Sequence, residues 1–305
     1  MNTVAETPIS VAPKSAPPRY AVLASFRRSR LAGTALVVLC VIIFAAVFAN
    51  VITPQNPYNL AELDIMDSRM PPGTKSDDGK SFFWLGTDEQ GRDMYSAILY
   101  GLRISLGVGV ISTLIALTLG MAIGLAAGYA GGWVDAVIMR IVDLQLSFPS
   151  ILIALVLLAV LGQGVDKIVI ALVTVQWAYY ARTVRSTALV EKRREYVDAA
   201  VCLAYSPWRI IYRHILPNCL PPLIVVATVQ VAHAIALEAT LSFLGLGMPI
   251  TSPSLGLLIA NGYAHMLSGK YWMSFFPGIA LLATIVTINL VGDHLRDVLN
   301  PRLQT

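Results

Sequence analysis

Charged residues are scarce in this chain of 305 residues: they make up 13% of it, whereas soluble domains carry about 25%. Hydrophobic residues make up 56%, and the mean hydropathy is +0.68. A soluble domain of this length cannot cover so much apolar surface. The composition therefore excludes an average soluble protein and predicts an integral membrane protein.

Signatures of enzyme chemistry are also missing. A phosphate-binding loop needs glycine, four residues and then Gly-Lys-Ser or Gly-Lys-Thr, and the nearest approach, from Gly73 to Ser81, has five intervening residues. There is no His-Glu-x-x-His pair and no Gly-x-Ser-x-Gly elbow. The three cysteines lie in or beside predicted spans and a basic loop, so no disulfide framework is expected. We expect no metal, no cofactor, no ATP and no catalysis in this chain.

The chain contains long apolar runs with few charged residues. A membrane-crossing helix needs about 20 residues; the first run, 31–52, has this length and exceeds a signal-peptide core, so it should stay uncleaved. Five further spans are predicted at 104–128, 141–161, 168–184, 223–246 and 275–291. The predicted fold class is therefore an all-α integral membrane protein with six helices.

Charge predicts the orientation of these spans. Basic residues gather in the first thirty residues and in the loop after the fourth span, which by the positive-inside rule should be cytoplasmic. The segment between the first two spans carries eight acidic residues against five basic ones, so it should lie outside. Both termini are then cytoplasmic. The sequence pI near 9.0 reflects this orientation, and nucleic-acid binding is not needed to explain it.

The most patterned stretch is the cytoplasmic loop at 195–218, EYVDAAVCLAYSPWRIIYRHILPN. Glu195, Ala199 and Ala200 are expected on one face of a short helix, where small alanines let a partner approach closely. Ser206, followed by proline, predicts the start of a second helix, because serine caps free backbone donors and proline loses no hydrogen bond there.

The second helix of this loop should carry an apolar stripe. Trp208, Ile211 and Ile215 recur at offsets of three and four residues, and Pro217 is expected to stop the helix. An ordinary amphipathic loop is the alternative interpretation of the same spacing.

This loop resembles the EAA loop of bacterial ABC importer permeases, whose helix docks onto an ATPase subunit. The resemblance implies ATPase coupling for Glu195, Ala199, Ala200, Ala204, Ser206, Trp208, Ile211, Ile215, Leu216 and Pro217. Ala204 departs from the family pattern, which usually has glycine at the turn. A left-handed residue other than glycine costs about 1 kcal/mol, so either the turn is built differently or the loop is mildly strained.

Further segments resemble the dipeptide, oligopeptide and nickel branch of this family, specifically the second of its two paired permeases. They are WLGTDEQGRD with YGLRISL, the stretch GYAGGWVDAVIMRIVDLQLSFPS, LSFLGLG, and NLVGDHLRDVLNPRL. The resemblance implies a type I importer fold in the bacterial inner membrane, with a second permease, two ATPases that bind ATP and Mg²⁺, and a solute-binding protein as partners. It also implies short peptides or a related small solute as cargo.

Together these observations predict a division of the chain into four parts. They are a flexible cytoplasmic tail (1–30), the first helix with the outer segment (31–102), the permease core (103–292) and a cytoplasmic C-terminal tail (293–305). The polar residues at 86–93 are expected to form a hydrogen-bonded turn, in which Asp88 and Asp93 accept from backbone donors or pair with Arg92; direct solute contact is the alternative.

Several residues within the spans are candidates for a translocation path or a helix interface. Gly120, Gly124 and Gly128 repeat every four residues, as in close helix packing. Pro149 is expected to kink its helix, either for gating or for packing.

Glu238 and Gln230 are the polar candidates on the fifth span. Glu238 should face a cavity, a partner or the bundle interior, either on the path or as an anchor bonded to a neighbouring helix. An ion-gradient-driven secondary transporter, the rival function, would use intramembrane carboxylates and often inverted repeats. A purely structural scaffold would not need the capped loop.

Overall fold

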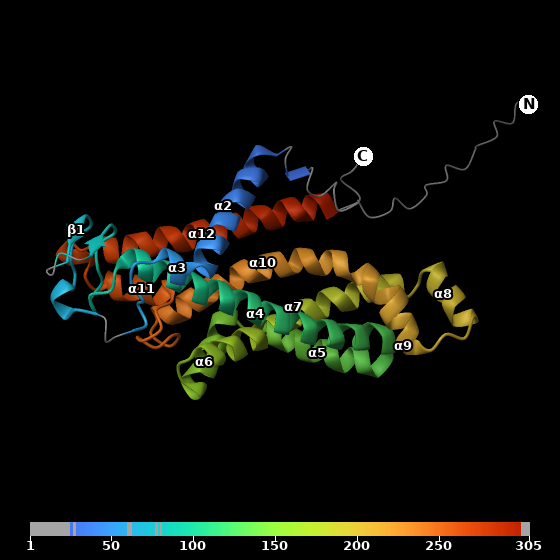
Figure 1. The fold of residues 1–305 in the computed structure, drawn as a ribbon. Coiled ribbons are helices and arrows are strands. Elements are labelled where there is room, and N and C mark those ends of the chain that lie inside the picture. Colours follow the sequence, from blue (N-terminus) through green and yellow to red (C-terminus); the bar gives the residue numbers. More distant parts are fainter. Residues whose placement is uncertain (1–24, 27–28, 60–62, 77–78, 80, 300–305) are drawn as a thin grey trace, which may run out of the picture.

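The computed structural model describes residues 25–26, 29–59, 63–76, 79 and 81–299 (Figure 1). The predicted N-terminal tail, 1–30, therefore lies mostly outside the described residues. Of the predicted C-terminal tail, 293–305, only residues 293–299 are described. The α-helices are α2 (Arg30–Val47), α3 (Ala49–Ile52), α4 (Met94–Ala130), α5 (Gly132–Ser147), α6 (Ser150–Leu161), α7 (Val165–Glu191), α8 (Glu195–Cys202), α9 (Pro207–Ile210), α10 (Leu216–Phe243), α11 (Leu255–Tyr263) and α12 (Trp272–Leu299).

Shorter elements complete the described fold. The 3₁₀-helices η2 (Ile65–Asp67) and η4 (Met266–Ser268) lie in the connections, and the π-helix η3 (Ile211–Ile215) joins α9 to α10. Strands β1 (Thr74–Lys75) and β2 (Phe82–Phe83) pair antiparallel. Figure 1 shows β1 and α11 at one end of an elongated bundle and α8 and α9 at the other.

Four continuous helical stretches of the described chain are long and apolar enough to cross a membrane. They are α2, α4, the run from α9 through η3 to α10, and α12. The pair α5 and α6 would make a fifth span, although it is bent by 89°. Helix α4 begins at Met94, ten residues before the predicted start of the second span at 104, and Asp93 caps it by accepting from the Ser96 N–H.

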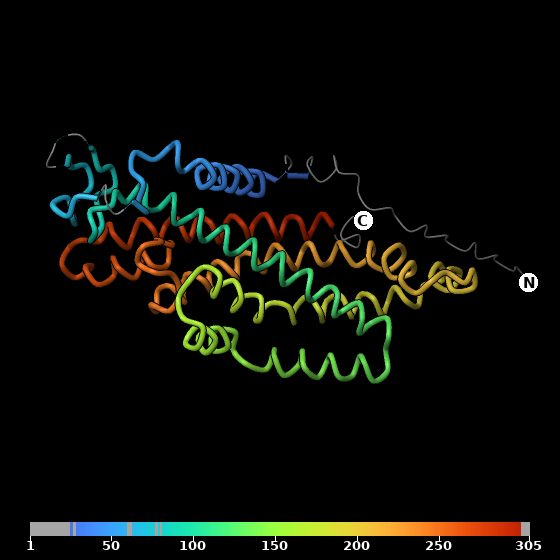
Figure 2. The backbone as a smooth tube through the Cα atoms, turned by 60° about the horizontal axis from the view of Figure 1, so that its bottom comes forward, coloured from blue at the N-terminus to red at the C-terminus, as the bar shows by residue number. Residues whose placement is uncertain are grey.

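The fourth predicted span, 168–184, lies in α7, which does not reach the same apolarity over its 27 residues. Helix α7 packs most extensively on α4 and also against α5, α6 and α10, and Figures 1 and 2 show it running beside α4. Gln176 and Tyr180 are fully buried among these neighbours. A helix enclosed by other helices need not be apolar all round, because protein rather than lipid surrounds its polar groups.

Pro149 bends the span predicted at 141–161 more sharply than a kink, because the helix is interrupted there. Helix α5 ends at Ser147, Phe148 is extended, and Pro149 takes the N-cap position of α6. Proline restricts the residue before it to extended conformations. That restriction at Phe148 ends α5 and allows the chain to turn through the 89° bend before α6 begins.

The glycines of α4 face α7. A Cβ added to Gly124 would lie 2.5 Å from the Ala181 carbonyl oxygen, and one added to Gly128 would lie 2.9 Å from the Ala188 Cβ. A Cβ on Gly120 would overlap the Trp177 carbonyl in the same way. The interface made by this stripe is therefore within the chain, where it lets the α4 and α7 backbones touch.

A short helix follows the fifth predicted span. Gly245 has a φ of 78° and turns the chain after α10, and the helix α11 begins at Leu255. Its start is capped by Ser254, whose hydroxyl accepts from the Leu257 N–H at 3.3 Å. Serine before an apolar run was the signal in the sequence for this helix.

Replacing Gly124 by alanine tests the α4–α7 packing. We expect Gly124→Ala to lower stability by about 1 to 3 kcal/mol, as overpacking does, because its methyl group would meet the α7 backbone. Gly107 lies on the same helix, and a Cβ added there would meet no atom within 4 Å, so Gly107→Ala is the matched control and should not destabilise the protein. Thermal unfolding of both variants in detergent measures the difference, and equal behaviour would contradict the packing argument.

Candidate functional site

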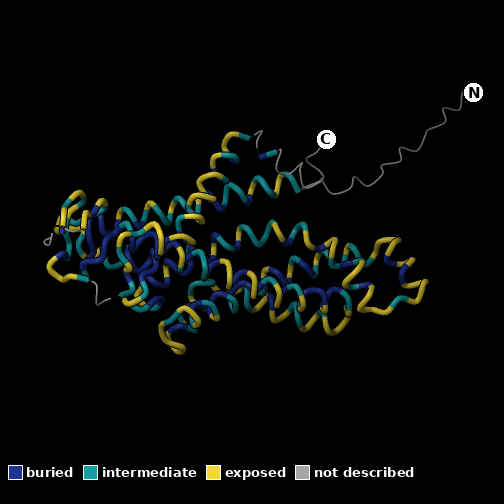
Figure 3. Tube along the Cα trace, viewed as in Figure 1, coloured by how far each residue is buried: buried dark blue, intermediate teal, exposed yellow. Residues whose placement is uncertain are grey.

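The loop at 195–218 lies at the end of the bundle, directly between α7 and α10, and Figure 3 shows α8 and α9 largely exposed. The start of α2 and the end of α12 are directed toward this end and away from β1 in Figures 1 and 2. The described structure thus builds the loop as a surface feature on two long helices.

Ala204 adopts the left-handed conformation, with a φ of 54°. The Ala204 N–H donates to the Val201 carbonyl at 2.9 Å, and the Tyr205 N–H donates to the Ala200 carbonyl at 3.2 Å, which closes the end of α8. The sequence left open whether the turn is built differently or carries strain. The structure has the ordinary left-handed turn. Alanine therefore carries the strain that glycine would avoid.

Ser206 begins the second helix as predicted. Its hydroxyl accepts from the Arg209 N–H at 3.4 Å, and Pro207 takes the first position of α9. Arg209 in turn lies 4.1 Å from the centre of the Tyr205 ring, a cation–π contact across the turn.

The three residues of the Glu-Ala-Ala run do not share one open face. Glu195 and Ala199 are exposed, whereas Ala200 is 3% exposed and packs into a core with Val197 and Ile210. The prediction of a common face was wrong because five residues turn an α-helix by about 140° beyond a full revolution. Ala199 is thus open to a partner, and Ala200 anchors α8 to the bundle.

The expected apolar stripe also divides. Trp208 is 68% exposed and stacks on Tyr212 with ring centres 5.9 Å apart, whereas Ile215 is buried and Ile211 only partly so. The π-helix η3 changes the helical phase between Trp208 and Ile215. Trp208 and Ile215 therefore point to different surroundings.

Pro217 does not stop the helix, contrary to the prediction. The Leu216 N–H donates to the Ile211 carbonyl, five residues back, and α10 then continues to Phe243. Proline is tolerated in the first turn of a helix, where its missing N–H is not needed. The π turn supplies such a new start at Leu216.

The two polar candidates of α10 make contacts between helices. Glu238 is fully buried, and its carboxylate accepts from the Ser105 hydroxyl on α4 at 2.9 Å and from the Ser242 hydroxyl at 2.8 Å. Gln230 is buried too, and its backbone carbonyl accepts from the Gln176 side chain on α7 at 3.4 Å.

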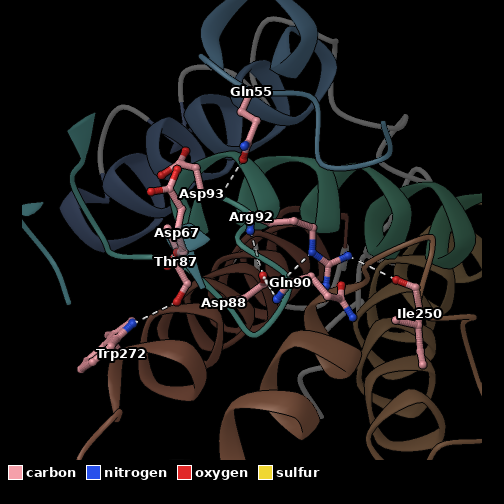
Figure 4. Close-up of polar contacts among 9 residues, drawn as sticks. All are labelled: Gln55, Asp67, Thr87, Asp88, Gln90, Arg92, Asp93, Ile250 and Trp272. Atoms are coloured by element: carbon pink, nitrogen blue, oxygen red, sulfur yellow. Dashed lines mark hydrogen bonds and ion pairs between the residues drawn. The ribbon is translucent and has the colours of Figure 1, made fainter. Parts of the chain in front are cut away.

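A polar knot occupies the other end of the molecule (Figure 4). Asp88 accepts from the backbone N–H groups of Gln90 and Arg92 at 2.8 and 2.9 Å and pairs with the Arg92 Nε at 2.6 Å. Arg92 is fully buried and also donates to the Ile250 carbonyl at 3.2 Å. The predicted hydrogen-bonded turn is confirmed, since Asp93 also accepts from a backbone donor in capping α4.

Metal ligation has no candidate site in the part of the chain that the structure describes. No group of three or more histidine, cysteine, aspartate or glutamate side chains there could hold an ion.

Known proteins resemble this chain in sequence and in fold. Residues 120–305 match the family described as binding-protein-dependent transport system inner membrane component, and residues 19–72 match the N-terminal TM domain of oligopeptide transport permease C. The dipeptide transport system permease protein of Escherichia coli (strain K12) is 39% identical over 304 residues, which cover 100% of both chains.

Two other relatives are similar in sequence, and one solved structure is similar in fold. A di/tripeptide transport system permease protein of Pseudomonas aeruginosa (strain UCBPP-PA14) is 35% identical, covering 92% of this chain and 91% of the relative. The glutathione transport system permease protein of Pectobacterium atrosepticum is 34% identical, covering 92% and 90%. The inward-facing MetNI methionine ABC transporter superposes with a TM-score of 0.56 at 18% identity, covering 68% of this chain and 98% of that one.

The chain therefore belongs to the family of binding-protein-dependent transport system inner membrane components. It is a non-catalytic permease subunit of an ATP-binding cassette importer, and ATP hydrolysis belongs to separate subunits. The predicted fold class and family are confirmed, and nothing in these comparisons favours an ion-gradient-driven transporter.

Changing Ala204 to glycine tests the strain in the loop. We expect Ala204→Gly to stabilise the loop by about 1 kcal/mol, because glycine adopts a positive φ without steric cost. Ala199→Gly is the matched control: Ala199 lies within α8, so glycine there should destabilise by about 1 kcal/mol. Hydrogen exchange of the loop amides in the purified protein would report both changes. Faster exchange in Ala204→Gly would contradict the assignment of strain.

Proposed function

We propose that this chain is the second permease of a pair that forms the membrane path for short peptides or a related small solute. A periplasmic or lipid-anchored solute-binding protein would deliver the solute, and two separate ATPases carrying ATP and Mg²⁺ would drive transport. The relatives support this cargo, because they are named for dipeptides, di/tripeptides and glutathione.

The proposed orientation puts the 195–218 loop and both termini in the cytoplasm of a bacterium, with the chain in the inner membrane and divided at 1–30, 31–102, 103–292 and 293–305. Support comes from the basic residues near both the N-terminus and the loop. The directions of α2 and α12 support it too, since the start of α2 and the end of α12, which lie nearest the two termini, are both directed toward the loop (Figure 1).

One observation carries the proposed mechanism: a capped and exposed pair of short helices directly joins the ends of α7 and α10. Glu195, Ala199 and Trp208 would form the surface that meets the ATPase, because all three are exposed. Ala200 and Ile215 would transmit the motion, because both are packed into the bundle core. ATP-driven closure of the ATPases would then displace α7 and α10 together.

The remaining candidate residues would shape the bundle that moves. We assign Glu238 to anchoring rather than to the path, because serine hydroxyls on α4 and α10 satisfy its buried carboxylate. The glycine stripe of α4 and the break at Pro149 would set the relative positions of α4, α5 and α7 in the same way.

Uptake into vesicles tests the function itself. The complete complex, with its binding protein, should import a labelled dipeptide or labelled glutathione only when ATP is present on the loop side of the membrane. Collapse of proton and sodium gradients should leave that uptake in place. Uptake that follows an ion gradient and ignores ATP would instead support the secondary transporter.

A substitution at Ala199 tests the docking surface. Ala199→Lys places a long charged side chain on the exposed face of α8, so uptake should fall about tenfold or more, as a docking loss of about 1.4 kcal/mol would give. Ala200 is unsuitable for this test because lysine there would be buried. The control is Ala130→Lys at the exposed end of α4. Normal uptake by the Ala199 variant would exclude α8 from the docking surface.

A further inference from the structure

The side-chain oxygen of Tyr196 links the 195–218 loop to both α7 and α10. The Tyr196 hydroxyl on α8 donates to the Glu191 carboxylate, the last residue of α7, at 2.5 Å. The Asn218 side-chain amide, in the first turn of α10, donates to the Tyr196 oxygen at 3.0 Å. The same amide donates to the His214 carbonyl in η3 at 2.8 Å, and the Tyr196 hydroxyl lies 3.3 Å from that carbonyl.

Hydrogen-bonding capacity fits this arrangement. A phenol carries one proton, which goes to Glu191 at the shortest distance, and its oxygen remains free to accept from Asn218. Partial burial and the adjacent Glu191 raise the pKa of Tyr196 to about 12, so the hydroxyl keeps its proton at neutral pH. Hydrogen bonds to a charged acceptor are the stronger kind.

The bridge spans the π-helix η3, which interrupts the α-helical hydrogen bonding between α9 and α10. The π-helix η3 contributes only five residues, and π turns inside α-helices are rare, single-turn features. A push on α8 could therefore be absorbed by bending at η3 unless α8 is fixed to both sides of it.

Apolar contacts alone do not fix the position of α8 relative to α7 and α10. Val197, Ala200 and Ile210 pack the loop against the bundle, but such contacts are non-directional and allow sliding. The bonds of Tyr196 are directional and reach α7 and α10 at once, and the Asn218 amide extends the link to the His214 carbonyl in η3. They set how the three elements lie relative to one another.

We propose that Tyr196 is a positioning residue, which locks the end of α7, the helix α8 and the start of α10 into one unit, so that displacement of the loop moves both membrane helices together. This inference rests on the proposed coupling of the loop to an ATPase. None of the residues that carry the lock belongs to the exposed docking surface of Glu195, Ala199 and Trp208.

Distance measurement between α7 and α10 tests the lock directly. With the three native cysteines replaced by alanine, spin labels are attached at Val190→Cys and Leu220→Cys, both exposed positions on α7 and α10. In the assembled complex we expect one narrow distance peak, unchanged between the nucleotide-free state and the state trapped with ATP and vanadate. Adding Tyr196→Phe should broaden or split the peak in the trapped state.

The matched control is Tyr212→Phe, which removes a hydroxyl from an exposed tyrosine of η3 that lies outside this bridge. It should leave the peak narrow. A peak that Tyr196→Phe leaves unchanged, or that both variants broaden alike, would overturn the proposal while leaving the proposed function intact. A complex that purifies without any ATPase would overturn both.

Coupling efficiency gives a second readout, which a loss of stability alone would not produce. The ratio of ATP hydrolysed to labelled dipeptide imported should rise several-fold for Tyr196→Phe and for Glu191→Ala. Glu191→Gln retains an oxygen that accepts from the phenol, so it should restore most of the coupling. Equal ratios for Glu191→Ala and Glu191→Gln would count against the lock, even if Tyr196→Phe reduced the amount of folded complex.

Discussion

The contact between α4 and α7 is the constraint on which the rest of the permease depends. Helix α7 carries buried polar side chains such as Gln176 and Tyr180, which lipid would not accommodate. The glycines of α4 let the two backbones meet, so that α7 is enclosed by protein on several sides. Because the loop follows directly from the end of α7, the same contact fixes where the loop leaves the bundle.

Helix α4 also connects the two ends of the molecule. Its 37 residues extend over about 55 Å, more than the hydrocarbon core of about 30 Å. Asp93 caps it beside the buried Arg92 knot, and its other end lies beside Lys192, whose amino group donates to the Tyr129 carbonyl at 2.6 Å. A single continuous helix therefore extends from the polar knot to the region of the 195–218 loop.

The short helices of the loop carry two sets of side chains, one exposed and one buried. One set of side chains, including Ala199 and Trp208, is open to solvent, and another, including Ala200 and Ile215, is buried in the bundle. Short helices can serve both purposes because a cap at Ser206, a left-handed turn at Ala204 and the π turn of η3 orient them. The bonds of Tyr196 add direction to what the apolar contacts hold in place.

The sequence by itself determined the membrane class, the family and the cap at Ser206. Each of these follows from composition or from residues close together along the chain, where local chemistry decides the conformation. Only the tertiary structure decided the break at Pro149, the passage of α10 through Pro217 and the burial of Ala200. It alone also brought together Glu191, Tyr196 and Asn218, because their meeting depends on how distant helices pack and not on any periodicity in the chain.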